Sequence, residues 1–388
     1  FTRAVIESEG EVLVHGIAAM PGKPTIAGIC RGRPVFGAPG YPVSSAVAFE
    51  EVMAPLIRWL ARREEQRRPE LLMELTRKTP SRLGVEEFVR LAVGRVDQKL
   101  VATPLGRGAG NITTLTRAQA VMRIPPESEG AAEGALVKGA LLCAPEELDS
   151  ILVCVGSHDN VLDLLADELM GLEDAPFRFV STHVGSMGGI AAIKNGSCHL
   201  GGMHLFDENT GDFNFPDLAK FLPDVEVAVI NLAIRHQGLI VRKGNPLDIQ
   251  GVKDLGRKDV RFINRQRGAG TRILLDWHLK EAGMRPADVA GYDREESTHM
   301  AVAANVLTGA AQCGMGIFAA AQALDLGFVP LARERYDLVM PVRFLHDPRI
   351  EAVLGLMRSQ EFQSRIEALG GYETSLSGRL MAPGLGLG

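Results

Sequence analysis

The chain is poor in cysteine and aromatic residues and carries little net charge. Its five cysteines are scattered and include no CxxC pair, a pattern that predicts buried thiols in a reducing compartment. Its 42 basic and 47 acidic residues leave a net charge of −5, which argues against a nucleic-acid binder that relies on bulk charge. The opening residues lack a basic segment followed by an apolar one, so no secretory signal is expected.

A membrane-spanning segment is not expected either. Residues 300–324 carry no formal charge, but Asn305, Gln312, Gln322 and several glycines interrupt them. A helix, a short strand and a second helix therefore fit this stretch better than a membrane span. The composition, with 46% hydrophobic and 23% charged residues in a chain of 388, is typical of a globular protein of two to three domains. We expect a soluble, cytoplasmic protein that binds neither membranes nor nucleic acid.

Hydrophobic periodicity divides the chain into three regions. Residues 1–66 combine short apolar strands with one following helix. Residues 67–145 contain strand-length segments separated by turns about every ten residues, which predicts a small all-β barrel or sandwich without intervening helices. Residues 146–388 alternate strands and helices, which predicts a largely parallel sheet. Strands near 228–243 and 334–341 are expected to pass between two lobes of that region, so the predicted fold class is multidomain α/β.

Polar, glycine-rich turns follow the expected strands of the third region where helices begin. The carboxyl ends of parallel strands form the ligand crevice of open α/β sheets, and helix N-termini there present free N–H groups to an anion. Helix capping is the ordinary explanation for a single Ser or Thr, whereas the GSMGG and RQRGAGTR turns together favour a binding cleft. The candidate ligand-binding residues are Ser157, Asp159, Ser186, Met187, Gly188, Arg267, Gly270, Thr271 and Thr298.

Arginines near these turns offer a choice of cationic contacts. Arg265, Arg267 and Arg272 could all reach an anion, but arginine also covers apolar surface and pairs with carboxylates. At most one of the three is expected to bind the ligand, and we choose Arg267. The hypothesis assigns the main attraction for a compact dianion to peptide dipoles rather than to cationic side chains.

No resident metal site is expected. His158, His183, His204 and His299 lie near predicted strand ends, but no pair of them has a zinc-like spacing. Residues 207–212 begin like a calcium loop and lack its twelfth-position glutamate.

Two rigid turns mark the first region. Pro21-Gly22-Lys23-Pro24 lies between two expected strands, and residues 38–44 precede the expected helix. A lysine between prolines suits contact with phosphate or molybdate, because its ammonium group is a compact charge. On spacing alone, a turn with a solvated lysine is the better explanation.

These turns carry a family resemblance. The segment GIAAMPGKPTIAGICRGRPVFGAPGYPVSSAVAFEEVMAPLI resembles the final third of the molybdopterin-binding α/β domain in the MoeA and gephyrin family of molybdopterin molybdenumtransferases. The segments SRLGVEEFVRLAV and ATPLGRGAGNITTLTRAQAVMRIPPESEGAAEGALV resemble that family's small C-terminal β-barrel. The third region, with SHDN, GSMGGIAAIKNG, GGMHLFD, NRQRGAGTR and GYDREESTHMAVAANV, is similar to a periplasmic-binding-protein-like module of the LysR substrate-binding type that is fused to some members. The implied architecture is a partial MogA-like α/β segment at 1–66, a β-barrel at 67–145 and a two-lobed module at 146–388.

The resemblance also implies a function. The family inserts molybdate into adenylylated molybdopterin and releases AMP, with help from a divalent metal such as Mg²⁺. Lys23 would then be a catalytic residue facing the pterin phosphate or the molybdate, and Arg90 would be a second one at the Phe-x-Arg position of the barrel. The implied cofactor-binding residues are Pro21, Gly22, Gly40, Pro42, Ser44 and Thr113. In that family the barrel meets the pterin domain of another subunit, so a homodimer is implied.

The chain departs from the family pattern at three points. Met20 stands where a basic residue commonly precedes PGKP, and Tyr41 replaces the usual Asn of PGNPVS. The chain also begins inside the pterin-binding domain, so we expect a fragment of a longer polypeptide that lacks transferase activity by itself.

Two functional hypotheses follow. In the first, the chain is part of a molybdenum-insertion enzyme with a fused module that binds molybdate or tungstate. In the alternative, it is a non-catalytic sensor of a small organic or pterin-like effector, which needs a wider crevice. A crevice that fits four oxygens favours the first hypothesis, and a much larger one favours the second.

Overall fold

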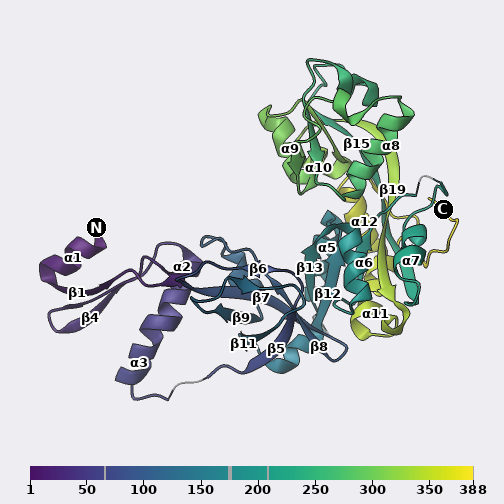
Figure 1. Ribbon diagram of the computed structural model, residues 1–388. Coiled ribbons are helices and arrows are strands. Elements are labelled where there is room, and N and C mark those ends of the chain that lie inside the picture. The colour runs from purple at the N-terminus through teal and green to yellow at the C-terminus, as the bar shows by residue number, and fades with distance from the viewer. Residues whose placement is uncertain (65–66, 174–176, 208, 388) are drawn as a thin grey trace. The chain divides into compact units, whose positions relative to one another are not determined.

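The computed structural model describes residues 1–64, 67–173, 177–207 and 209–387. Contacts between Cα atoms divide the chain into two units, Phe1–Ile151 and Leu152–Gly388. The predicted fold class is confirmed: a short α/β segment and a β-barrel make up the first unit, and a two-lobed α/β arrangement makes up the second (Figure 1). The boundary expected at residue 66 lies outside the described residues.

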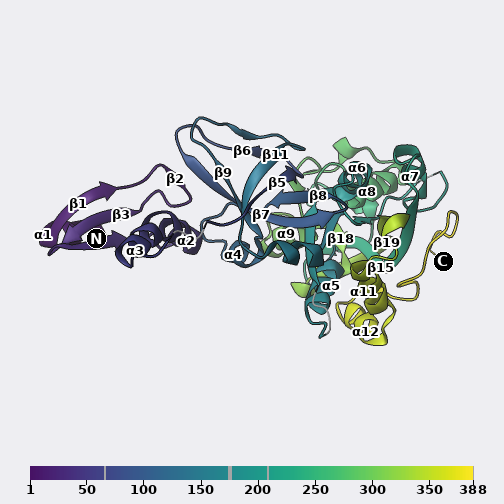
Figure 2. The same cartoon turned by 90° about the horizontal axis from the view of Figure 1, so that it is seen from below.

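The first unit opens with a small antiparallel sheet and a helical segment (Figure 2). The strands pair in the order β1-β3-β4, and α1 packs on them through the buried side chain of Ile6. The bounds are α1 Thr2–Glu9, β1 Gly10–His15, β3 Ile26–Cys30, β4 Arg33–Gly37, α2 Pro42–Ala48, a π-helical turn Phe49–Met53 and α3 Ala54–Leu60. The single helix expected after the strands is therefore present, with a π-turn in its middle. Pro42 suits its start, because the fixed φ of proline fits the first turn of a helix.

The rest of the first unit is a closed β-barrel. Strands β7, β8, β5, β11 and β9 pair in that order, and β9 returns to pair with β7. Buried apolar side chains such as Met73, Leu91 and Val101 form its core. The bounds are β2 Ala19–Met20, β5 Glu70–Leu75, β6 Thr79–Pro80, β7 Glu86–Val96, β8 Lys99–Pro104, β9 Ala120–Ile124, β10 Gly130–Ala131 and β11 Leu136–Leu141. The short strand β2 of the preceding segment pairs in parallel with β7, which links the two parts of the unit.

The expectation of a barrel without helices is wrong at one connection. A short helix, α4 (Thr113–Arg117), lies between β8 and β9. Asn111 starts it: the Thr114 hydroxyl donates to the Asn111 carbonyl at 2.8 Å, and the Thr113 hydroxyl donates to the Asn111 side chain at 2.7 Å. Such local side-chain hydrogen bonds stabilise a helix start within a polar loop.

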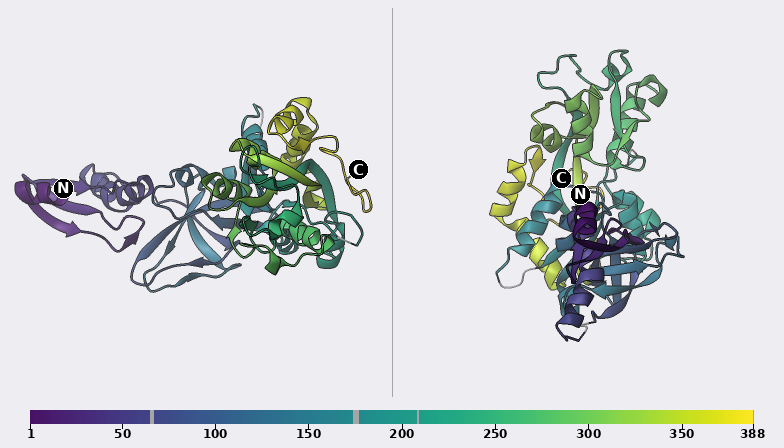
Figure 3. Two further views of the ribbon diagram at one scale, coloured as in Figure 1. Left: turned by 90° about the horizontal axis from the view of Figure 1, so that it is seen from above. Right: turned by 90° about the vertical axis from the view of Figure 1, so that its left-hand side faces the viewer.

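The second unit has two lobes (Figures 1 and 3). The first lobe contains β12 Ile151–Gly156, α5 Asn160–Met170, β13 Arg178–His183, α6 Gly185–Lys194, β14 Gly201–Met203, α7 Phe215–Phe221, α11 Pro348–Arg358, α12 Gln360–Ala368 and β20 Tyr372–Glu373. The second lobe contains β16 Phe262–Arg265, α8 Gly270–Glu281, β17 Glu295–Glu296, α9 His299–Thr308, β18 Cys313–Ile317 and α10 Phe318–Ala323. Short 3₁₀ turns lie at Pro145–Ser150, Val252–Gly256, Pro286–Asp288 and Val342–Phe344.

Two long strands join the lobes. β15 (Val227–Val241) and β19 (Gly327–Pro341) pair antiparallel along their whole length, and both run through the two lobes. The expected crossing strands are thus confirmed, with the second one starting earlier than predicted. The pairing register shifts on β15 between Asn231 and Ala233 and again between Gln237 and Gly238. The large sheet has the order β14-β19-β15-β18-β16-β17, and β16 is parallel to β17 and β18.

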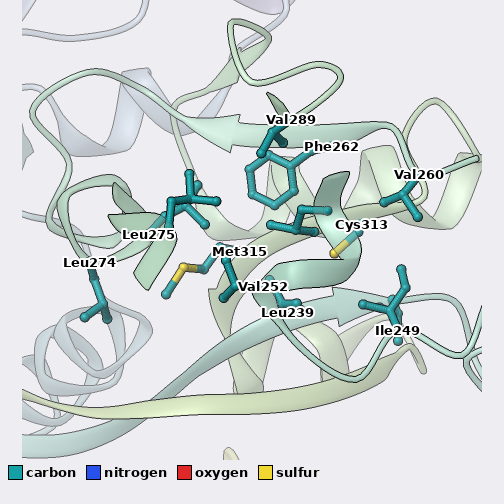
Figure 4. Packing of buried hydrophobic residues seen from close by; sticks show 13 residues of the cluster. Leu239, Ile249, Val252, Val260, Phe262, Leu274, Leu275, Val289, Cys313 and Met315 are labelled. Carbon is teal, nitrogen blue, oxygen red and sulfur yellow. The ribbon is translucent and has the colours of Figure 1, made fainter. Parts of the chain in front are cut away.

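The second lobe has its own hydrophobic core (Figure 4). Leu239 of β15, Phe262 of β16 and Met315 of β18 pack against Leu275 of α8, and all four side chains are buried. This core fixes the ends of β16 and β18 and hence the start of α8.

The uncharged stretch at 300–324 folds as expected. It forms most of α9, then β18 and α10, a helix, a strand and a second helix. No helix in the described part of the chain is long and apolar enough to cross a membrane.

Close packing of two glycines in the first lobe generates a test of this fold. A Cβ on Gly156, the last residue of β12, would lie 2.4 Å from the carbonyl oxygen of Gly202 on β14. Because backbone cannot move aside as a flexible side chain can, we expect Gly156→Ala to lower the free energy of unfolding by about 1–3 kcal/mol. Urea denaturation of the whole chain measures this change.

Gly355 provides the matched control. It lies within α11, is exposed, and has nothing within 4 Å of a Cβ placed on it. Gly355→Ala should stabilise the chain by up to about 1 kcal/mol, because alanine is the better helix former. Equal unfolding midpoints for Gly156→Ala and the unsubstituted chain would contradict the packing of β12 on β14.

Candidate functional site

A cavity in the first unit brings together residues that are far apart in the sequence. Its volume is about 390 Å³. The lining residues are Ala19, Met20, Pro21, Gly22, Lys23, Pro24, Tyr41, Ser44, Glu87, Phe88, Val89, Arg90, Leu105, Arg107 and Ala109. We call this cavity the first-unit pocket. It lies between the turn at 20–24, the start of α2 and strand β7 of the barrel.

Local geometry explains how the turn is held. The Thr25 hydroxyl donates to the carbonyl of Gly22 at 2.6 Å, and Gly22 has a φ of +128°, which favours glycine. The amide of Val43 in α2 donates to the carbonyl of Ala109 at 3.1 Å, which joins α2 to the loop that follows β8. Lys23, at the tip of the turn, is exposed.

Arg90 is the buried cation of the first-unit pocket. Its Nε donates to Thr114 Oγ1 at 2.8 Å and its Nη2 to the Gly106 carbonyl at 3.4 Å. Nη1 has no hydrogen-bond partner among the described residues. Burial lowers the pKa of this guanidinium group, and a buried donor without a partner is costly, so Nη1 is suited to an anionic ligand.

Glu87 is the buried acid of the same pocket. Its Oε1 lies 3.0 Å from Arg107 Nη1, while Oε2 has no partner within the described ranges. The pocket therefore presents a free donor and a free acceptor within one set of buried side chains.

Of the residues predicted for a pterin site, the pocket lining includes Pro21, Gly22, Lys23, Ser44 and Arg90. Three others are not part of that lining. Gly40 and Pro42 flank Tyr41 at the start of α2, and the Thr113 hydroxyl is bonded to Asn111 in α4. The neighbouring Thr114, which sequence reasoning missed, is the residue that contacts Arg90.

A second set of polar residues is buried where the two lobes of the second unit meet. We call it the interlobe cluster, and it consists of Asp159, His204, Arg235, Gln237, Arg265, Thr271, His299 and Glu334. Asp159 and His204 come from the first lobe, and Arg265, Thr271 and His299 from the second. The remaining members lie on the long strands β15 and β19.

Arg235 lies at the centre of the interlobe cluster. Its Nη1 donates to Asp159 Oδ2 at 2.6 Å and its Nε donates to Glu334 Oε1. The guanidinium carbon lies 4.9 Å from the centre of the Tyr336 ring. Burial alone would raise the pKa of Glu334, but Arg235 outweighs it, with help from His204 and Gln237, and the pKa falls to about 2. Glu334 is therefore ionised, and Arg235 has two carboxylate partners.

His204 and Gln237 are attached to this ion pair. His204 Nε2 and Ser157 Oγ are 2.7 Å apart, and His204 Nδ1 lies 3.3 Å from Glu334 Oε2. Gln237 Nε2 donates to Glu334 Oε1 at 2.8 Å and to Thr271 Oγ1 at 3.1 Å. The Gln237 amide oxygen is left without a partner among the residues described.

Arg265 differs from the other arginines of the second unit. It is 6% exposed, and its Nη2 donates to the Ser297 carbonyl at 3.1 Å. Its Nε and Nη1 have no hydrogen-bond partner in the part of the chain that the structure describes. Burial and the nearby charge of Arg235 lower the pKa of Arg265 to about 10, so it remains a cation at neutral pH. A buried cation without a bonded carboxylate is unfavourable unless a ligand supplies the missing charge.

Arg267 and Arg272 are placed differently. The side chain of Arg267 is 79% exposed, with its Nε 3.4 Å from Glu295 Oε1. Arg272 also donates to Glu295 and lies over the ring of Tyr292. Of the three arginines considered from the sequence, only Arg265 combines burial with unpartnered donors among the described residues.

The other residues predicted for an anion site have identifiable structural partners. Asp159 Oδ1 accepts from Val161 N at 2.9 Å, so Asp159 caps α5 as well as pairing with Arg235. Thr298 caps α9 by accepting from Ala301 N at 3.0 Å. Ser186 accepts from the amide of His204 at 3.2 Å. Met187 and Gly188 follow it in the first turn of α6.

Gly270 and Thr271 bring α8 against the first lobe. A Cβ on Gly270 would lie 2.4 Å from His204 Nδ1, so glycine allows this approach. Thr271 accepts from Gln237. Thus Ser157, Asp159, Ser186, Gly270 and Thr271 all lie at or beside the interlobe cluster.

Sequence reasoning missed Arg235, Gln237 and Glu334. A usable signal was present for Arg235, because it is a charged residue within a long, mostly apolar strand. Glu334 lies in a charged run of β19 and gives no such signal. Charged side chains are almost never fully buried unless they are paired.

Three family models match consecutive parts of the chain. The model described as a probable molybdopterin binding domain matches residues 1–59, and the MoeA C-terminal region (domain IV) matches residues 73–142. The PBP superfamily domain matches residues 167–358.

Similar proteins match different parts of the chain. The Bacillus subtilis protein YvgK is 36% identical over 230 residues, which are 59% of this chain and 73% of that protein. A putative molybdopterin biosynthesis protein of Methanocaldococcus jannaschii is 35% identical over 141 residues, 36% of this chain and 32% of the relative. Among solved structures, a MoeA molybdopterin biosynthesis protein from Pyrococcus horikosii is 36% identical, with a TM-score of 0.32 and coverage of 37% of this chain and 35% of that one. The chain thus spans about a third of the molybdopterin relatives.

The unpaired charge of Arg265 generates a stability prediction. Without ligand, Arg265→Met should raise the free energy of unfolding of the second unit by about 1–4 kcal/mol, because a buried charge is replaced by an apolar side chain of similar length. Arg272→Met should lower it, because Glu295 loses its donor. Thermal unfolding of both variants without added anions measures this contrast. A lower melting temperature for Arg265→Met would contradict the description of Arg265 as a buried cation without a bonded carboxylate.

Proposed function

Because the chain belongs to the MoeA and gephyrin family of molybdopterin molybdenumtransferases in its first unit and to the periplasmic-binding-protein superfamily in its second, we propose that it acts in molybdenum cofactor biosynthesis. In this proposal the first unit takes part in the insertion of molybdate into adenylylated molybdopterin. The second unit binds molybdate or tungstate.

The first-unit pocket supports the first part of the proposal. It places Lys23, from the segment like the pterin domain, in the same lining as Arg90, from the barrel. An exposed ammonium group and a buried guanidinium nitrogen without a partner in the described chain suit a phosphate or molybdate oxyanion. Phe88, Val89 and Leu105 provide apolar surface for a ring system in the same cavity.

The described residues do not fit the Mg²⁺ ion that the family implies. Magnesium is held by several oxygen ligands in octahedral geometry. In the first-unit pocket Glu87 is the single carboxylate of the lining, and Arg107 pairs with one of its oxygens. No group of three or more His, Cys, Asp or Glu residues suited to a metal ion occurs among the residues that were placed. We therefore assign no part of the reaction to a metal held by this chain.

The interlobe cluster supports the second part of the proposal. The observation that carries it is the pair of unpartnered nitrogens on the buried Arg265, noted above for the described residues. α8 begins at Gly270, shortly after Arg265 in the chain, and α9 begins at His299, shortly after Ser297, whose carbonyl accepts from Arg265. Helix N-termini favour anions. A small oxyanion would satisfy the arginine and the helix starts together.

Two features of the chain as a whole remain predictions. The homodimer follows from the resemblance, in which the barrel meets a pterin domain of a second subunit. The cytoplasmic location follows from the expected reducing environment of the five cysteines, of which Cys154, Cys198 and Cys313 are buried thiols.

The first-unit pocket is tested by binding of molybdopterin, followed through the fluorescence of the pterin. Lys23→Ala and Arg90→Met should each weaken binding by about tenfold or more, because each removes a charge-assisted contact. Lys138→Ala, which changes an exposed lysine on the barrel strand β11, should leave the affinity unchanged. Unchanged affinity in both pocket variants would rule out this site.

Calorimetric titration of the full chain with molybdate, tungstate and sulfate tests the second unit. We expect micromolar binding of at least one anion, with a loss of about 100-fold in Arg265→Gln. Arg267→Gln, two residues away and exposed, is the matched control and should change the affinity less than about threefold. A large loss of affinity in Arg267→Gln with little change in Arg265→Gln would assign the anion contact to Arg267 instead. No heat of binding with any of the three anions would exclude an oxyanion-binding module.

A further inference from the structure

His299 has a ring nitrogen that nothing in the described structure uses. It is the first residue of α9, and its side chain is buried. Its Nδ1 has no hydrogen-bond partner among the residues that the structure describes. A Cβ placed on Gly316 of β18 would lie 3.4 Å from Nδ1.

The electrostatic surroundings of His299 are almost entirely positive or neutral. Arg265 on β16 and Arg235 on β15 are the charged groups that act on it most strongly, followed by the histidines His204 and His158. Burial, reinforced by the two arginines, lowers the pKa of His299 well below its ordinary value. The ring is therefore neutral at physiological pH in the absence of an anion.

The other elements packed against α9 do not change this picture. The titratable group of β18 is the buried thiol of Cys313, and α10 has no titratable side chain. On β17, Glu296 accepts from Asn305 at 2.9 Å, further along α9. Glu295 of the same strand is engaged with Arg272 and Arg267.

Charge balance identifies what the cluster lacks when a dianion binds. Arg235 and Arg265 together balance the two carboxylates, Asp159 and Glu334, so the cluster has no excess positive charge before an anion binds. Molybdate and tungstate bring two further negative charges and no proton near neutral pH. Additional positive charge is therefore needed, because a buried charge without compensation is strongly unfavourable.

We propose that His299 supplies this additional positive charge by taking up a proton when a tetrahedral dianion binds at Arg265. The proposal rests on the oxyanion-binding role proposed for the second unit and names the residue that selects for a dianion. In the binding step the proton leaves the buffer acid and forms an N–H bond at His299 Nδ1. That N–H then donates to an oxygen of the anion. The net change is one anion and one proton bound, with no covalent bond to the anion.

The neighbouring histidines are less suited to this role. His204 has both ring nitrogens close to a partner, Ser157 on one side and Glu334 on the other. His158 lies 3.4 Å from Asp163 through its Nε2. His299 Nδ1 has no hydrogen-bond partner among the described residues, and Arg265 is the charged group that acts most strongly on its ring.

The proposal predicts a definite pH dependence. The pKa of His299 is higher with the dianion bound than without it, so binding is tightest below the pKa of the free protein. Affinity then falls as the pH rises toward the pKa of the complex, by about tenfold per pH unit when a full proton is coupled. Binding without proton coupling would be independent of pH over that range.

The experiment is calorimetry of sodium molybdate binding to the full chain at one pH in two buffers with different enthalpies of ionisation. The difference in observed heat gives the number of protons taken up, expected to be about one for the unsubstituted chain. His299→Asn places an amide near the position of Nδ1 and cannot titrate, so its proton uptake should fall to near zero. His346→Asn is the matched control, because His346 is 94% exposed and should leave the uptake unchanged.

The outcomes separate the two proposals. If molybdate binds without proton uptake, or if His299→Asn takes up the same number of protons, the role of His299 is wrong and the anion site stands. If neither molybdate nor tungstate binds, the oxyanion module itself is excluded, and with it this inference. Nitrogen-15 spectra of the histidine rings in the unsubstituted chain, with and without molybdate, give the same answer if the Asn variant does not fold: an imidazolium signal from His299 is expected only in the complex.

Discussion

The burial of Arg235 between two carboxylates is the interaction on which the second unit depends. Asp159 from the first lobe and Glu334 from β19 hold its guanidinium group, and Glu334 in turn contacts His204 and Gln237. An ion pair of this kind is costly to break, because removing one partner leaves a buried charge. Both lobes are therefore tied to one cation. This arrangement uses up the acidic groups of the cluster and leaves Arg265 as the cation without a bonded carboxylate among the described residues.

Each of the two units buries an arginine side chain. Arg90 in the barrel and Arg265 in the second lobe are both buried, and both keep donors free within the described chain. Burial lowers the pKa of each guanidinium group, yet both stay charged because arginine begins from a very high pKa. Each unit therefore keeps a fixed positive charge in a place from which water is largely excluded, where attraction to an anion is stronger than at the surface.

The alternation of apolar strands and helices was enough to predict the two-lobed unit and its crossing strands. The spacing of turns predicted an all-β barrel or sandwich, and the family resemblance implied the barrel. The resemblance pointed to the motif at 21–24 and to Arg90 separately, and it did not predict that they line one cavity, as they do in the structure. The spacing of residues in the sequence could not show which of Arg265, Arg267 and Arg272 is buried with free donors in the described chain. That depends on where β16 ends against β17 and β18. The hypothesis that peptide dipoles supply the main attraction for a dianion stays a prediction. Helix α4 was missed because it depends on the side-chain hydrogen bonds of Asn111 rather than on apolar periodicity.

The register shifts on β15 occur on either side of Arg235 and beside Gln237. An irregularity of this kind disrupts the ladder locally and increases the twist of the strand. Because β15 and β19 run without interruption through both lobes, neither lobe can rotate without bending this ribbon. Bending concentrates where the ladder is weakest, and the side chains carried there turn with the backbone. In this protein, the joint between the lobes carries Arg235 and Gln237, two of the buried polar residues of the interlobe cluster.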